Sequence, residues 1–580
     1  MDKRAELADA LATTLIYHAS SLQALGRLLE AEERQKESVA IRRRLVEVER
    51  RSELAGSLAA ALGRQGEMLR SLGRPAEAEP CQRETVAIYR RLTEADEKPA
   101  LLAALATALD HHGDTLQALD RFAEAEESQA ENVTVCRRLA EADKRAEAAA
   151  RLARSLGRHG LLLQADDQMH PAEQCQREGV AILRRLVEAD KRAGLAHDLA
   201  IALSNHGLVL RVLGNLEEAE RCQSENAAIC RRLVEVEGRV DLADYLAWAL
   251  GHRGLLLQEL GHLSEAEQCQ RKSVAILRQL VESAKRAELS QDLAIALGNH
   301  ASVLQALGRL AEAEPCQREG IAIYRRLIEG EKRTELLAAL AAALGNHGSV
   351  LAALERPAQA EECQRENVAI RRRLVAAMPQ AEMEDALATA LGNHGSALQA
   401  LGRLAEAEAC QRENVAILRR LVEEKRRAEL ASYLAWALGH HGLLLQSLQR
   451  LAEAELCQRE SVAILRRLVE VEKRSMLAYD LAIALSNHAE SLQLLGRLAD
   501  TERCRRECAT ILRQLTAMEK HSGIRDDLAI ALSNHEEVLR ALGQTAEAEQ
   551  CRREAVLHRS PAPGDGAEDR ATAAARKSAV

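Results

Sequence analysis

Apolar residues recur along the chain in paired helical stripes that a short polar break separates. Within residues 381–427, the first stripe consists of Leu387, Leu391, Leu398 and Leu401, and the second of Ala407, Ile417, Leu418 and Leu421. Spacings of three and four residues predict two amphipathic helices. Gly402 lies between the stripes, and glycine suits the left-handed residue that ends a helix. Because the break is so short, the two helices are predicted to form an antiparallel hairpin.

The same pattern returns every 47 residues without a gap. Alanine at the Ala407 position recurs at Ala31, Ala78, Ala125, Ala172, Ala219, Ala266, Ala313, Ala360, Ala454 and Ala548, and Thr501 stands in the remaining copy. A period of this length indicates a repeat architecture rather than separate globular domains. We therefore predict an all-α solenoid of twelve tandem 47-residue antiparallel helix hairpins over residues 5–559.

The predicted repeats are residues 5–51, 52–98, 99–145, 146–192, 193–239, 240–286, 287–333, 334–380, 381–427, 428–474, 475–521 and 522–559. Ser560-Pro561-Ala562-Pro563-Gly564 ends the helical pattern, so residues 560–580 are predicted to be a disordered C-terminal tail.

Composition and charge support long helices and exclude several functional classes. Only nine Phe, Trp and Tyr residues occur among 580, fewer than a globular core of this size would bury. The 79 basic and 88 acidic residues give a net charge of -9 and are interspersed, which is typical of a solvated helical surface and not of a nucleic-acid footprint. We find neither a secretory leader nor a run of about 18 apolar residues, so we expect a cytoplasmic protein without a membrane span.

The small-residue pattern resembles the tetratricopeptide repeat (TPR). Gly395 and Ala407 match the small residues at which that family's two helices cross, Gly402 matches its turn glycine, and Leu398 matches the large apolar residue before the turn. Residues 404–421, LAEAEACQRENVAILRRL, look most like the longer repeats of kinesin light chain and of bacterial and fungal signalling arrays. The resemblance implies a right-handed superhelix whose first helices line a concave groove. His394 and Gln411 depart from the family, which usually has leucine and an aromatic residue there.

Two columns of chemically active residues run through the repeats. Histidine occupies one column at His18, His112, His159, His206, His300, His347, His394, His441, His488 and His535, with Gln65 and Arg253 as exceptions. Cysteine occupies the other at Cys81, Cys175, Cys222, Cys269, Cys316, Cys363, Cys410, Cys457, Cys504 and Cys551. Because His394 and Cys410 are nearly symmetric about Gly402, we expect them to approach each other.

We interpret both columns as structural, with no metal, no cofactor and no catalytic residue. One His and one Cys per repeat are too few for a closed zinc site, and repeats about 10 Å apart cannot form disulfides. A neutral, packed imidazole hydrogen-bonded to Gln411 or Glu413 is the expected arrangement. Catalysis needs one distinctive constellation, whereas every candidate here recurs in equivalent surroundings, so we predict that the chain is not an enzyme.

Two further columns are candidate peptide-binding positions of the groove. The Thr389 position is held elsewhere by Thr13, Ala60, Thr107, Arg154, Ile201, Trp248, Ile295, Ala342, Trp436, Ile483 and Ile530. Exposed apolar residues there would favour a binding surface, and burial against the next repeat is the alternative. The next column contains Asn205, Asn299, Asn346, Asn393, Asn487 and Asn534. Resemblance to kinesin-light-chain-like arrays implies that these amides bind an extended peptide backbone, and an internal amide ladder is the alternative.

The sequence thus predicts a non-enzymatic scaffold that binds an extended peptide or protein segment along its concave groove. Two alternatives stay open. One is a self-assembling rod that associates end to end, because the first repeat carries Ile16 and Tyr17 where others have small or amide residues and no polar helix caps the C-terminal end. The other is the sensor arm of a signalling complex that acts in trans.

Overall fold

A computed structural model describes residues 3–188, 193–378, 380–518 and 522–558. The predicted tail, residues 560–580, lies outside the described residues. The chain divides into two compact units, Met1–Ile276 and Leu277–Val580. The division falls within helix α12 (Leu263–Glu282).

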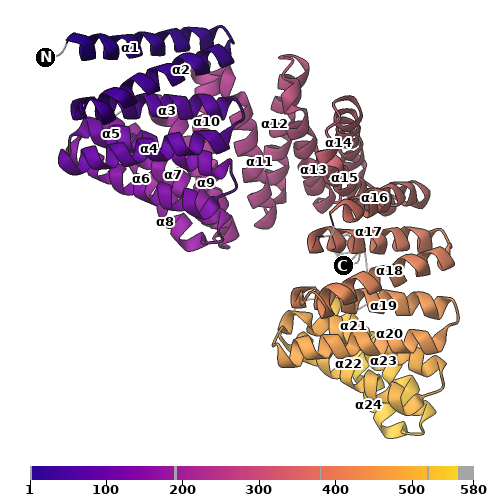
Figure 1. The fold of residues 1–580 in the computed structure, drawn as a ribbon. Coiled ribbons are helices and arrows are strands. Elements are labelled where there is room, and N and C mark those ends of the chain that lie inside the picture. The colour runs from indigo at the N-terminus through magenta and orange to yellow at the C-terminus, as the bar shows by residue number, and fades with distance from the viewer. Residues whose placement is uncertain (1–2, 189–192, 379, 519–521, 559–580) are drawn as a thin grey trace. The chain divides into compact units, whose positions relative to one another are not determined.

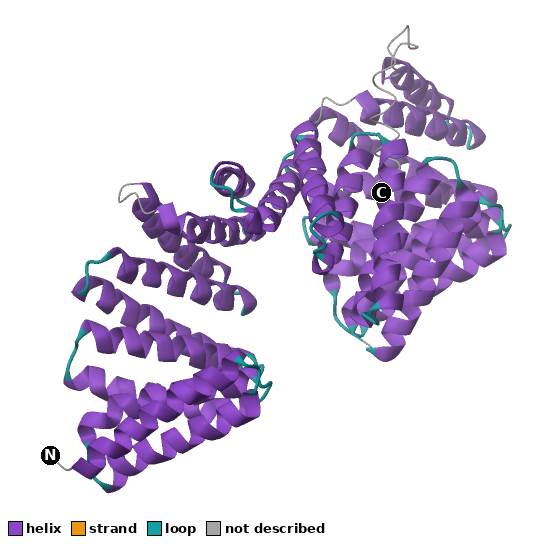
Figure 2. Cartoon of the chain, turned by 90° about the horizontal axis from the view of Figure 1, so that it is seen from above, coloured by secondary structure: helices purple, strands orange, loops and turns teal. Residues whose placement is uncertain are grey.

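The described residues of the first unit form helices without strands, joined by short loops (Figures 1 and 2). They are α1 (Lys3–Ala24), α2 (Leu28–Arg43), α3 (Ala55–Ser71), α4 (Pro75–Ala95), α5 (Pro99–Gln117), α6 (Phe122–Ala142), α7 (Ala146–Ala165), α8 (Met169–Glu188), α9 (Ala196–Val212), α10 (Leu216–Arg231) and α11 (Ala243–Glu259), followed by the start of α12.

The described part of the second unit repeats this organisation. Its helices after α12 are α13 (Ser290–Ala306), α14 (Leu310–Gly330), α15 (Leu337–Ala353), α16 (Pro357–Ala377), α17 (Ala381–Ala400), α18 (Leu404–Glu423), α19 (Ala431–Ser447), α20 (Leu451–Arg466), α21 (Ala478–Leu494), α22 (Leu498–Met518), α23 (Ser522–Ala541) and α24 (Thr545–His558).

From α1 to α11 and from α13 to α24, consecutive helices pack against each other as hairpins and each hairpin packs on the next, which confirms the predicted solenoid of helix hairpins. The odd-numbered helices are the first helices of the hairpins, and neighbours such as α3 and α5, or α19 and α21, touch each other. Leu391 and Ala407 are completely buried where the two helices of one hairpin cross. The apolar stripes therefore form the core, as their spacing predicts.

The turn inside each hairpin is a left-handed helix cap. Gly402 has a φ of 73°, and the Arg403 amide donates to the Leu398 carbonyl at 2.9 Å, the long bond of this cap. Glu355 and Gln449 adopt the same left-handed φ in other repeats although they carry side chains. The predicted role of the turn glycine is thus confirmed, and it is a preference rather than a requirement.

The connection between hairpins contains short helical turns that the sequence pattern did not predict. After α18, Arg426 is left-handed, and Ala428–Leu430 forms a 3₁₀ turn that buries Leu430. Similar turns are Ser52–Leu54, Ala193–Leu195, Val240–Leu242, Ala287–Leu289, Thr334–Leu336 and Ser475–Leu477. Three second helices end in π turns of identical sequence, Arg44–Val48, Arg232–Val236 and Arg467–Val471. The polar connection that follows α18 therefore also carries a buried leucine.

A ladder of ion pairs links successive second helices. Arg419 of α18 lies 2.9 Å from Glu460 of α20. The same contact recurs as Arg43–Glu84, Arg90–Glu131, Arg137–Glu178, Arg184–Glu225, Arg278–Glu319, Arg325–Glu366, Arg372–Glu413, Arg466–Glu507 and Arg513–Glu554. At the remaining step Lys272 stands where the glutamate would be, opposite Arg231. Each pair is largely exposed and stabilises the stacking only slightly.

One described segment, Thr334–Ala353, is long and apolar enough by length and composition to cross a membrane, contrary to the expectation from the sequence. It comprises the 3₁₀ turn before α15 and α15 itself, which packs against α14 and α16. The Gln364 side chain donates to the Gly345 carbonyl of this helix at 2.9 Å. Since α15 occupies the same place as the other first helices, we interpret it as a core helix of the solenoid.

Candidate protein-interaction surface

The histidine column lies in the seam between neighbouring repeats. His441 Nδ1 is 3.8 Å from Cys457 Sγ of its own hairpin, and His441 Nε2 is 3.2 Å from Glu408 Oε1 of the preceding one. Other members of the seam are His159–Glu126, His206–Glu173, His347–Glu314, His394–Glu361, His488–Glu455 and His535–Glu502. Arg253, an exception to the column, reaches Glu220 in the same way.

These contacts confirm one expectation and correct another. His394 does approach Cys410, at 3.6 Å between Nδ1 and Sγ. The predicted partners Gln411 and Glu413 are wrong, because His394 Nε2 points to Glu361 of the preceding hairpin, at 3.3 Å. The imidazole therefore joins two repeats instead of bracing one.

Burial in the seam favours the neutral form of His112, His347, His394 and His488, because it lowers the pKa of each. Burial raises the pKa of Cys457 to about 11, so this side chain is a thiol and its S–H faces His441 Nδ1. The other ring nitrogen of His441 lies within hydrogen-bond distance of the Glu408 carboxylate. Burial lowers the pKa of His394, and the nearby Glu361 offsets this only in part. The seam thus brings a thiol, an imidazole and a carboxylate together, as Cys457, His441 and Glu408 show.

The seam has the features of a packing device. All the described cysteines are free thiols, and burial raises the pKa of Cys410 as it does that of Cys457. Among the described residues, no group of three or more His, Cys, Asp and Glu side chains is placed to hold a metal ion.

The glutamine that departs from the family pattern explains the neighbouring glycine. Gln458 is 1% exposed and lies across Gly442 of the first helix, so that a Cβ built on Gly442 would stand 2.6 Å from Gln458 Cγ. Equivalent close approaches occur at Gly66, Gly160, Gly207, Gly254 and Gly348. The flat amide fills the space of the family's aromatic side chain, and glycine stands opposite it in most repeats, although alanine does so at Ala19 and Ala301.

Gly442→Ala should therefore lower the free energy of unfolding by about 1–3 kcal/mol, because the added methyl group overpacks the crossing. Gly298→Ala is the matched control, since this helical glycine has nothing within 4 Å of the added Cβ. It should raise stability by about 0.5–1 kcal/mol through helix propensity alone. Chemical denaturation measures both, and equal effects of the two substitutions would contradict the packing argument.

The column of Gly392 is small for a related reason. A Cβ on Gly392 would lie 3.1 Å from the Asn414 amide nitrogen, and one on Gly345 would lie 2.9 Å from that of Asn367. Both asparagines belong to the second helix of the same hairpin. In these two repeats the second helix fills the space beside the glycine, whereas the space beside Gly298 of the same column is open.

The apolar column of candidate binding residues is exposed on the first helices. The exposed fractions are 38% for Ile201, 40% for Trp248, 45% for Ile295 and 43% for Ile483. Trp248 meets the edge of Tyr245, with ring centroids 5.3 Å apart. Trp436 is half-buried against His440, with centroids 4.1 Å apart. The three isoleucines and Trp248 therefore face outward, whereas Trp436 is half-buried, as are Thr13, Ala60 and Thr107 of the same column.

The candidate asparagines share this surface, which we call the first-helix face: the positions equivalent to Ala386, Thr389, Asn393 and Ser396 on the odd-numbered helices. Asn346 and Asn393 are exposed, whereas Asn205, Asn299, Asn487 and Asn534 are half-buried. Within the described ranges none of the six side-chain amides has a hydrogen bond to another protein group. Their donors and acceptors are thus available to a bound partner, and they do not form an internal ladder.

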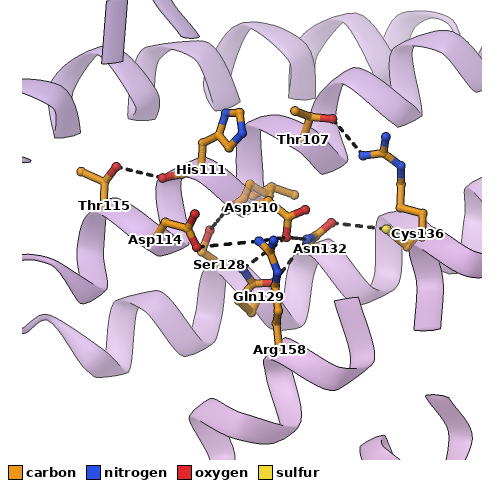
Figure 3. Close-up of polar contacts among 12 residues, drawn as sticks. Thr107, Asp110, His111, Asp114, Thr115, Ser128, Gln129, Asn132, Cys136 and Arg158 are labelled. Atoms are coloured by element: carbon orange, nitrogen blue, oxygen red, sulfur yellow. Dashed lines mark hydrogen bonds and ion pairs between the residues drawn. The ribbon is translucent and has the colours of Figure 1, made fainter. Parts of the chain in front are cut away.

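Sequence reasoning missed a charged network on the first-helix face of the first unit (Figure 3). Asp110 accepts a hydrogen bond from the buried Asn132 at 2.6 Å, and Arg158 of α7 lies 3.3 Å from the Asp110 carboxylate. Beside it, Asp114 pairs with Arg70 at 3.1 Å. The available signal was Asp110 itself, which stands in the column that is glycine or serine in most repeats.

Stacked helix hairpins with a uniform seam and a variable exposed face define a helical repeat protein of the protein-interaction class. Two family profiles described as "Tetratricopeptide repeat" match residues 57–131 and 198–279, and residues 11–50, 293–330, 340–376 and 387–425, together more than half of the chain. The chain belongs to the tetratricopeptide-repeat family. Such proteins are in general non-enzymatic scaffolds, and no catalytic family is indicated.

Solved structures that match the chain include BtubC (BKLC) from P. vanneervenii and the apo form of RapI. BtubC is 20% identical with a TM-score of 0.36, and the match covers 44% of this chain and 92% of BtubC. RapI is 14% identical with a TM-score of 0.44, and the match covers 70% of this chain and 97% of RapI. A search of the curated proteins finds no match.

Proposed function

We propose that the chain is a scaffold whose first-helix face binds an extended peptide or protein segment. The observation that carries this proposal is the exposed apolar column, Ile201, Trp248, Ile295 and Ile483, beside asparagines that have no protein partner. Exposed tryptophan and isoleucine at regular spacing supply apolar contact area. An amide both donates and accepts, which matches a peptide backbone. The pattern therefore suits one extended segment that crosses several first helices.

Trp248→Ala and Trp436→Ala should weaken binding of such segments. Peptides selected from a random display library on the intact protein serve as ligands, and their Kd is measured by fluorescence anisotropy. For peptides that bind the corresponding part of the face, we expect losses of at least about 30-fold, as for central aromatic residues of interfaces.

Leu456→Ala is the matched control, because this apolar side chain is 51% exposed but lies on the second helix α20. It should leave the affinities unchanged. If both tryptophan variants bind every selected peptide as tightly as the wild-type protein does, the first-helix face is not the binding surface.

A specific observation also favours end-to-end self-association. Leu11 is 52% exposed although its equivalent Leu387 is 5% exposed, and Val556 is 62% exposed although its equivalent Val462 is 4% exposed. These residues of α1 and α24 occupy columns that other repeats bury against a neighbour. Sedimentation equilibrium tests this second function, since a chain that stays monomeric at high concentration does not assemble in this way.

A further inference from the structure

Acidic residues of the first-helix face differ in their charged partners between the first unit and helices α21 and α23 of the second. In the first unit, Asp198 forms an ion pair with Arg154 of the neighbouring hairpin at 2.8 Å and Asp114 forms one with Arg70 at 3.1 Å, while Glu67 lies 2.6 Å from His111. These pairs neutralise the carboxylates within the protein. On the face of α5, α7 and α9, the negative charges of these carboxylates are therefore balanced within the protein.

Carboxylates at the same positions of α21 and α23 in the second unit lack these cations. On α21 and α23 they are Asp480, Asp527, Glu490 and Glu537. The repeat before Asp480 has Trp436 at the position of Arg154. The repeat before Asp527 has Ile483 at that position. Likewise, the repeat before Glu490 has Gln446 at the position of Arg70, which pairs with Asp114. The repeat before Glu537 has Gln493 at that position. Apolar and amide side chains have replaced every one of these cations.

The contacts of the four carboxylates agree with this substitution pattern. None of them has an ion pair among the described residues. Asp527 accepts a hydrogen bond from the Tyr479 hydroxyl at 2.6 Å, which does not neutralise its charge. Arg505 of α22 attracts Glu490 and Glu537 electrostatically, but it is buried and donates its hydrogen bond to Ser486. The face of α21 and α23 therefore carries uncompensated negative charge.

These charges flank the apolar column on both helices. Asp480, Ile483, Asn487 and Glu490 follow one another at intervals of three or four residues on α21, and Asp527, Ile530, Asn534 and Glu537 do so on α23. Such spacing places each set on one side of its helix. Ile483 and Ile530 are 43% and 59% exposed. Each helix thus presents an apolar side chain and a free amide between two carboxylates.

We propose that the first-helix face of α19, α21 and α23 binds an extended peptide segment in which lysine or arginine alternates with apolar residues. The cationic side chains pair with the four carboxylates, and the apolar side chains lie on Ile483, Ile530 and Trp436. The cationic side chains of the partner supply the positive charge that arginines of the neighbouring hairpin supply in the first unit. This inference rests on the proposed function and adds the chemical class of the partner and the part of the face that binds it.

The test uses two labelled peptides of about twelve residues, which span about 40 Å when extended. In one, lysine or arginine alternates with isoleucine or phenylalanine, and in the other glutamate replaces every basic residue. The full chain should bind the cationic peptide more tightly than the acidic one by at least about tenfold, and added salt should weaken the binding.

The decisive variant replaces all four carboxylates by amides: Asp480→Asn, Asp527→Asn, Glu490→Gln and Glu537→Gln. The Kd of the cationic peptide should rise at least about tenfold. A control variant removes the same number of charges from second helices, through Glu312→Gln, Glu406→Gln, Glu423→Gln and Glu453→Gln. It should bind the cationic peptide as the wild-type protein does.

The four amides should not unfold the protein. Burial raises the pKa of Asp480, so its amide removes a charge that folding disfavours, and the melting temperature of the variant checks this. Equal affinity of the amide variant and the wild-type protein, or tighter binding of the acidic peptide, would overturn the cationic partner. If Trp436→Ala and Ile483→Ala still weaken peptide binding in that case, the proposed function is retained and only the cationic class of partner is rejected. If neither peptide binds at all, both the partner class and the proposed function fail.

Discussion

Lowering the pH from about 7 to about 5 should reduce the melting temperature of the protein by several degrees, because the histidines of the seam must stay neutral. Burial lowers the pKa of His112, His347, His394 and His488, and the facing glutamates oppose this only in part. The unfolded chain takes up protons first, at its ordinary pKa of about 6.5. Their stabilising contribution is thus fully present above about pH 6.5 and is lost as the pH falls toward their lower folded values.

Carboxylates of the seam titrate in a separate, more acidic window. Burial disfavours the ionised form of Glu408, but hydrogen bonds from Arg412 and His441 more than offset it, so that the pKa of Glu408 is lowered. Its contribution is therefore present above the ordinary value of about 4.5 and is lost only below it. A stability change between about pH 7 and about pH 5 then reports on histidine.

The control is a variant in which His112, His347, His394 and His488 are all replaced by glutamine. This residue already occupies the column in one repeat, at Gln65. Melting curves at both pH values are measured by circular dichroism. The variant should be less sensitive to pH than the wild-type protein. A wild-type melting temperature that is the same at both pH values would contradict the buried, neutral seam.

Leu438→Ala should lower the free energy of unfolding by about 2–5 kcal/mol, the largest effect that we expect from one substitution. Leu438 is 1% exposed and belongs to a core cluster that joins α17 and α18 to α19. The truncation leaves a cavity between two hairpins, and a solenoid can only partly collapse around it.

Since each repeat contacts only its neighbours, the damage should remain local. Hydrogen exchange followed by mass spectrometry should show faster exchange in α17 to α21 and unchanged exchange in α3 to α7. Leu456→Ala, on the exposed side of α20, should alter stability by less than about 0.5 kcal/mol. Uniform acceleration of exchange along the whole chain would show that the repeats unfold as one block.

The periodic part of the fold could be predicted from the sequence, because the same apolar spacing recurs in every copy. The approach of His394 to Cys410 followed from their symmetric distances to Gly402. Its second partner, Glu361, could not be predicted, since it depends on how far one hairpin is rotated against the previous one. The 3₁₀ turn that buries Leu430 could not be predicted either, because a single leucine in a polar connection forms no periodic pattern.

The candidate binding face shows a similar limit. The outward position of Ile201 and Ile483 was one of two alternatives that the sequence left open, because a helix stripe does not reveal how far the next hairpin covers it. Ion pairing such as that of Arg154 with Asp198 depends on side chains 44 residues apart. Only the stacking of the hairpins shows which carboxylates keep a cation and which do not.

The ladder on the second helices has a consequence for the length of such chains. Arg419 and Glu460 are 41 residues apart and lie in adjacent copies of the same 47-residue unit. If recombination removed or added one whole unit, the arginine of one copy would meet the glutamate of another copy and restore the same pair. Genes of this kind can therefore lengthen or shorten their products in whole steps without creating a mismatched junction.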